Sequence, residues 1–348
     1  MIARQPAKVH TAFNPVVFEV QTSLEQVEMT VRIGSDVIEL TKEAFNGIVL
    51  FDISPILTKA FKDAGMVGNG TYWEDYYLSV NYNVKLEGQE IYFTAVNSVV
   101  QAGESSSLVA KQGSFLTKFD RLRFYPGYER VISVLGFDEA NYFNFEGESQ
   151  RAVNISGKVY NTNVKESNYI AISNNTGVEE YLTTNDDVVI TDNLGNPIVI
   201  VRGSAGLTIK RKYIDTCCVP QQPFYVRWVN TLGGRDYWMF SYRQYESNSI
   251  AERKEFIPYT DTSEVSSFTK TLSLKGKQTI LAGAGNLNSN EYEALKDIIY
   301  SPRVEYYNEE LGKWIEVQID DVELSNDSRS FVHGLALNFL LPTRQMQF

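Results

Sequence analysis

Few side chains in this sequence are suited to catalysis or metal binding. The 348 residues include only two histidines, His10 and His333, and two cysteines, Cys217 and Cys218. Zinc sites and nucleophilic triads need several such groups, so we expect neither. His333 shares a strand pattern with apolar residues and is expected to be packed, whereas His10 lies in a polar segment with no obvious partner. Adjacent cysteines suit a disulfide framework poorly, and we expect buried, reduced thiols.

Carboxylates are more plentiful, and they cluster locally. A retaining glycosidase needs two of them about 5 Å apart, and an acidic loop can bind calcium. Acidic clusters between strands are more often solvated, so we predict no catalytic residue and no metal site. The Gly-Ala-Gly at 283–285 lacks the third glycine and the βαβ pattern of a dinucleotide loop, so no cofactor is predicted. The carboxylates concerned are Glu179, Glu180, Asp186, Asp187, Asp192, Asp320 and Asp321.

Alternation of apolar and polar residues is the dominant pattern in the chain. It is clear in VEMTVRIG (27–34) and in LSVNYNVKLEGQEIYFTAV (78–96), where a glycine separates two alternating runs as in a β-hairpin. Helical periodicity is nearly absent. The sequence therefore predicts a mainly β fold, with antiparallel sandwich- or barrel-like domains and two short helices.

The two helices are predicted at residues 54–64 and 290–300. In the first, Ser54 suits the N-cap and Gly65 the C-terminal stop. In the second, Asn290 suits the N-cap with Glu293 three residues later, as in a capping box. Both helices have one apolar face for docking on a sheet.

Three regions follow from shifts in composition. We expect an N-terminal β domain with one helix (1–103), a middle β region (104–215) and a C-terminal β domain with one helix (216–348). The net charge of −11 and a pI near 4.9 disfavour nucleic-acid binding. No stretch has the length of a membrane span or the apolar core of a signal peptide, so we expect a chain made in the cytosol, without membrane insertion.

The segment PFYVRWVNTLGGRDYWMF (223–240) has large side chains on both faces of two predicted strands. One face, with Phe224, Val226 and Trp228, is expected in the core. The other would promote aggregation if left in water, so we expect a neighbouring chain to cover it. The candidate interface residues are Tyr225, Arg227, Tyr237 and Tyr242.

The order of several motifs resembles tail-tip or baseplate proteins, of the distal-tail-like kind, from tailed phages and prophages of Bacteroidetes-type bacteria. These motifs are FNPVVFEV, GIVLFDISPILTKAF, FDRLRFYPGY, the hairpin above, ALKDIIYSPRVEYY and LALNFLLPTRQMQF. The resemblance implies a non-enzymatic virion protein. Copies would form a homo-oligomeric ring at the end of the tail tube and hold other virion tail proteins, such as receptor-binding or fibre proteins.

Two other functions stay open on the residues alone. A carbohydrate-binding module would use exposed aromatic side chains as sugar platforms. A glycoside hydrolase would place paired carboxylates in a cleft. The tryptophans that could serve as platforms are Trp73, Trp228, Trp238 and Trp314.

Overall fold

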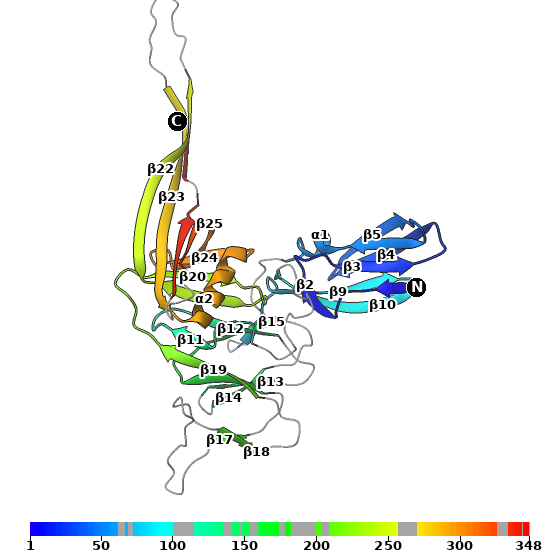
Figure 1. Cartoon of the computed structure of the whole chain (residues 1–348), viewed down its shortest axis with the longest axis horizontal. Helices are drawn as coiled ribbons and strands as arrows, with labels where there is room; N and C mark the ends of the chain where they lie inside the picture. The colour runs from blue at the N-terminus through cyan, green and yellow to red at the C-terminus, as the bar shows by residue number, and fades with distance from the viewer. Residues whose placement is uncertain are drawn as a thin grey trace, which may run out of the picture. The chain divides into compact units, whose positions relative to one another are not determined.

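The structure is a computed structural model (Figure 1), and it confirms the predicted mainly β fold, with 60% strand, several antiparallel sheets and two short helices. Its described residues form two compact units: unit 1 is Met1–Cys218 with Val229–Asp236, and unit 2 is Val219–Trp228 with Tyr237–Phe348. The expected boundary at 103/104 lies outside the described residues. These are 1–61, 67–68, 72–99, 115–135, 141–145, 148–152, 159–173, 178–181, 199–202, 209–256, 270–325, 333–342 and 344–347.

Unit 1 begins with a β-sandwich, drawn in blue to cyan in Figure 1. A three-stranded sheet and a five-stranded sheet share one core, which includes Phe18, Phe51, Met29 and Val84. The period-two alternation is the cause, because it gives each strand one apolar face. The three-stranded sheet has the order β1 (Ile2–Arg4), β3 (Val17–Gln21), β6 (Ile48–Asp52); the five-stranded sheet has β2 (Val9–Thr11), β10 (Gln89–Val96), β9 (Ser79–Leu86), β4 (Gln26–Ile33), β5 (Asp36–Glu43).

The rest of the described part of unit 1 forms three further sheets. Most pairs are antiparallel, but β11 pairs with β19 in parallel, as β2 does with β10. One sheet has the order β12 (Val131–Leu135), β15 (Val159–Asn163), β8 (Tyr72–Glu74), β7 (Val67–Gly68); the second has β11 (Arg121–Phe124), β19 (Ile209–Thr216), β16 (Tyr169–Ser173), β13 (Asn141–Phe145), β14 (Glu148–Ala152); the third pairs β17 (Val178–Tyr181) with β18 (Val199–Arg202).

Unit 2 is built on one large antiparallel sheet. No helix among the described residues is long and apolar enough to cross a membrane. The Gly-Ala-Gly at 283–285 lies inside a strand, where Gly283 pairs with Ala336, and is not a loop. The strand order is β21 (Arg235–Phe240), β20 (Phe224–Val229), β24 (Val304–Asn308), β25 (Lys313–Ser325), β26 (His333–Leu340), β23 (Lys270–Leu287), β22 (Tyr242–Phe256), and β27 (Arg344–Gln347) also pairs with β23.

The first predicted helix has the right position but is shorter than expected. α1 covers only Ser54–Leu57, its N-cap is Ile53 rather than Ser54, and Gly65 lies outside the described residues. Asp52 holds the start of α1, since its Oδ1 accepts hydrogen bonds from Ser54 N at 2.9 Å and Ser54 Oγ at 2.8 Å. Leu57 is fully buried and anchors the turn.

The second predicted helix is present, but its N-cap lies two residues earlier than predicted. α2 covers Ser289–Lys296 and continues as a 3₁₀ turn over Asp297–Tyr300. Its N-cap is Asn288, not Asn290: the Asn288 side chain accepts from Glu291 N at 2.8 Å, and the Glu291 carboxylate accepts from Asn288 N at 3.1 Å. This reciprocal pair is a complete capping box.

Candidate functional site

The second face of the 224–240 hairpin is covered by the same chain. Tyr225 and Tyr237 are 2% and 1% exposed, and their rings lie 5.5 and 5.9 Å from that of Trp314 on β25. The expectation that a neighbouring chain covers them is corrected: both are core residues of unit 2. A distant strand of the sheet supplies the partner, which local alternation could not indicate.

Arg227 is also engaged within unit 2. Its guanidinium lies 4.3 Å from the Trp314 ring centre, and its Nε donates to Glu305 Oε2 at 2.7 Å. Arg303 donates to the other oxygen, Oε1, at 2.9 Å. Two guanidinium groups thus neutralise one buried carboxylate. The fourth candidate, Tyr242, begins β22, and its side chain lies outside the described residues.

The opposite face of the hairpin is core, as predicted. Phe224, Val226 and Trp228 are all buried. The Phe224 ring lies 5.1 Å from that of Phe339 on β26, in an edge-to-face arrangement. Among the four tryptophans, Trp73 and Trp238 are also buried, so only half-buried Trp314 is partly accessible. Sugar platforms are therefore not available at three of the four predicted positions.

His10 is buried, contrary to the expectation of a polar segment without a partner. Its Nδ1 lies 2.9 Å from Ala7 O, an acceptor only, so Nδ1 carries the proton. Its Nε2 then accepts from the Tyr82 hydroxyl at 3.0 Å. Burial lowers the pKa of His10 and raises that of Tyr82. The pair is therefore a neutral core contact.

His333 and the two cysteines form no catalytic arrangement with the described side chains. His333 is half-buried, with its ring 5.0 Å from Tyr292 and its Nε2 3.3 Å from Ser289 Oγ. Both cysteines are free thiols, as predicted, but Cys218 is exposed and Cys217 only half-buried. The expectation of two buried thiols was wrong because these residues follow the last paired residue of β19.

Of the seven carboxylates in the predicted clusters, only Asp320 and Asp321 have described side chains. Asp320 forms an ion pair with Lys277 at 2.7 Å, and Asp321 accepts from Val322 N. Glu179 and Glu180 lie in β17, but their side chains are not described. Asp186, Asp187 and Asp192 lie outside the described residues. In the part of the chain that the structure describes, no group of three or more metal-ligating residues comes together.

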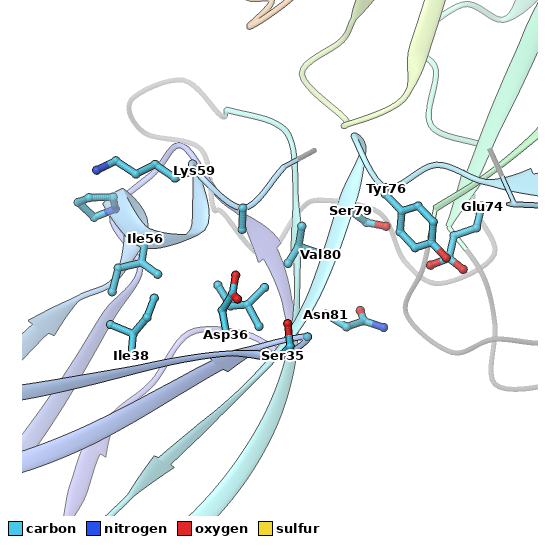
Figure 2. Close-up of a pocket in the computed structure, with 14 residues that line it drawn as sticks. Ser35, Asp36, Ile38, Ile56, Lys59, Glu74, Tyr76, Ser79, Val80 and Asn81 are labelled. Carbon is cyan, nitrogen blue, oxygen red and sulfur yellow. The ribbon is translucent and has the colours of Figure 1, made fainter. Parts of the chain in front are cut away.

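A cleft of about 720 Å³ opens in unit 1 (Figure 2). Ile56 and Lys59 line one side, Tyr76 and Glu74 the other, and Asp36 lies between them. Its size suits a small ligand, and the lining combines apolar walls with a few polar groups. No residue of this cleft was expected from the sequence, because it joins the β4–β5 turn, α1 and the start of β9.

A second feature that the sequence did not indicate is a long hairpin arm in unit 2. We define the arm as residues 250–256 of β22 and 270–276 of β23. These segments pair with each other, and β27 pairs with 273–276, but β26 pairs with β23 only from Thr279 onward. Figure 1 shows β22 and β23 continuing together past β20 and β24. The arm therefore lies beyond the wide part of the sheet.

No protein family and no curated protein sequence matches this chain. Among solved structures, the fibronectin(III)-like modules of CbhA from Clostridium thermocellum align with 62% of this chain and 94% of their own, at 10% identity and a TM-score of 0.17. At that TM-score the likeness carries no conclusion about fold or function.

Proposed function

We propose that this chain is a non-enzymatic structural subunit of a phage tail tip or baseplate. Its copies form a ring or hub that joins the tail to receptor-binding or fibre proteins, and the chain resides in the virion. The motif resemblance supports the class of particle. The arm supports assembly, and it is the observation on which the proposal depends most.

The arm has the properties of an assembly element. β22 and β23 contain 15 and 18 residues, whereas strands in globular proteins usually contain about 3 to 10. In the described part of the arm, Arg253, Lys254 and Glu255 are exposed, so these side chains add no apolar core. An isolated two-stranded ribbon is marginal in water. Contact with a neighbouring subunit would stabilise it.

The edge of the arm offers a means of contact. Among the described strands β22 is the last of its sheet, so no described strand pairs with the backbone groups on its outer side. Three register shifts interrupt its pairing with β23. Bulges and charged residues commonly protect an edge from indiscriminate pairing, and both occur here. This edge is therefore suited to pairing with one specific neighbour and is protected from unrestricted aggregation.

Solution mass tests the proposal. Light scattering of the purified chain should give a multiple of 39.5 kDa, and negative-stain images should show rings. Deleting 250–256 together with 270–276 keeps the register of the remaining β22–β23 pairs and should lower the mass of the assembly. Circular dichroism should lose only the strand signal of the deleted residues and of β27, which pairs with them. Leu311→Ser, at an exposed position in the same unit, is the control and should assemble normally. A monomer at every concentration would refute the proposed assembly.

The cleft supports a second candidate function, carbohydrate binding or glycoside hydrolysis. It combines one aromatic ring, Tyr76, with the carboxylates of Asp36 and Glu74 and the amide of Asn81. Stacking on a ring and hydrogen bonding to polar groups together can hold a sugar. A glycan array compares the two functions: binding that is lost in Tyr76→Ala but kept in the exposed control Tyr92→Ala favours this candidate.

A further inference from the structure

The turn between β20 and β21 is buried, which is unusual for a hairpin end. We call Val229–Asp236 the tip; these residues belong to unit 1, although the chain on both sides belongs to unit 2. Asn230 and Asp236 are each 1% exposed, and Arg235 is 7% exposed. Loops normally run over the surface, where water satisfies their polar groups. Here protein groups must do so.

The charged end of the tip binds a closed polar network. Arg235 Nε donates to Asp75 Oδ2 at 2.9 Å, and Asn161 Nδ2 donates to the same oxygen at 2.7 Å. Ser133 Oγ accepts from Arg235 N at 3.0 Å and donates to Asn161 Oδ1 at 2.6 Å. Every one of these side chains is buried. Asp75, Ser133 and Asn161 thus form one side of a socket for the tip.

The other end of the tip binds the chain around residue 116. Asn230 Nδ2 donates to Leu116 O at 2.8 Å and to Asp236 Oδ2 at 2.6 Å. Thr117 Oγ1 donates to Asp236 Oδ1. Asn230 Oδ1 accepts from Gly234 N at 3.0 Å, which holds the turn closed. Leu116 and Thr117 complete the socket.

At the two glycines of the tip, the backbone packs so closely against Val96 and Leu116 that no side chain has room. A Cβ on Gly233 would lie 2.0 Å from Val96 Cγ1, and one on Gly234 would lie 2.1 Å from Leu116 O. Gly233 also has a φ of +81°, which L residues rarely adopt. The sequence Gly-Gly is therefore required by close approach and by conformation together.

We propose that the socket is a recognition site for the tip, and that docking of the tip completes the folding of unit 1. Without the tip, the Asp75 carboxylate would be buried without its cation, and Ser133 Oγ and the Leu116 carbonyl would each lose a hydrogen-bond donor. An unpaired buried charge is strongly destabilising. Residues 1–218 therefore stay incompletely folded until the tip, later in the chain, has been made.

Two glycines of unit 1 form a matched pair for the test. Gly233 and Gly88 have φ values of +81° and +78°, but a Cβ on Gly88 meets nothing within 4 Å. Gly233→Ala and Gly88→Ala therefore share the backbone strain and differ only in the clash with the socket. Hydrogen exchange of the full-length variants should be at least about tenfold faster in β12 and β15 for Gly233→Ala than for Gly88→Ala. Exchange in β25 and β26 should not differ between them.

A milder pair of substitutions keeps the test decisive if Gly233→Ala does not fold. Arg235→Gln and Asp75→Asn remove one partner each, and both should accelerate exchange in β12. Exchange in the double variant should be no faster than in the single variant with the faster exchange, because neither charge is then left unpaired. Equal exchange in the two glycine variants, or fully additive effects of the two charge substitutions, would overturn the proposal.

Discussion

His10 shows at the residue scale how burial determines protonation. Its folded-state pKa lies below the ordinary value of 6.5, because burial disfavours the charged ring. The unfolded chain therefore binds more protons than the folded chain as the pH falls below about 6.5. The stabilisation is fully present above that pH and is lost as the pH falls toward the folded-state pKa. The melting temperature should decline over this range, before most carboxylates titrate.

A variant without the His10 imidazole tests this pH dependence. His10→Gln should make the melting temperature nearly independent of pH between about pH 7 and pH 5. Gln can still accept a hydrogen bond from Tyr82, but it does not titrate. Leu311→Ser, at an exposed position, changes no titrating group and should keep the wild-type profile. The same decline in both variants would show that another group is responsible.

Tyr225 tests the assignment of the second hairpin face to the core. Tyr225→Ala removes a ring packed between Tyr237 and Trp314 and should lower the free energy of unfolding by about 3 to 5 kcal/mol. Tyr92→Ala, at a position 66% exposed, should change it by no more than about 0.5 kcal/mol. Urea denaturation measures both. A small effect at Tyr225 would return that residue to the list of candidate interface positions.

At the scale of elements, the N-terminus of α2 offers two overlapping capping-box sequences, of which the helix uses one. The sequence NSNEYE places Asn288 before Glu291 and Asn290 before Glu293, and local rules alone do not choose between them. The structure uses Asn288. Asn288→Ala should therefore cost about 1 kcal/mol in thermal or urea unfolding, and Asn290→Ala clearly less. A larger cost at Asn290 would place the start of the helix where the sequence alone suggested it.

Strands were predictable in this protein where one face is buried and the other is wet. Tyr82, Val84 and Leu86 are buried in alternation along β9, as the pattern indicated. Long-range features were not predictable, because no local pattern encodes them. Trp314 covers Tyr225 from another part of the chain, and the socket draws Ser133 from β12, Asn161 from β15 and Asp75 from the residue after β8. The cleft and the arm likewise depend on which strands become neighbours.

At the scale of the whole molecule, the excess of acidic residues predicts that the protein does not bind polyanions. With a net charge of −11, it should pass through a heparin column at about 0.15 M salt and show no shift of duplex DNA. The same charge should retain it on an anion exchanger at pH 7. Salt-sensitive DNA binding at micromolar concentration would contradict the expectation that nucleic acid is not a partner.

The division into units has a consequence for how a gene of this kind can be recombined. The chain passes from one unit to the other at 218/219, at 228/229 and at 236/237. A single crossover at the first of these points would carry the tip away with the incoming unit 2. The hybrid would then keep its old Asp75 and Val96 beside a foreign turn. Only donors with a compatible Asn-Thr-Leu-Gly-Gly-Arg-Asp would yield a viable chimera, so this turn limits which lineages can exchange their C-terminal halves.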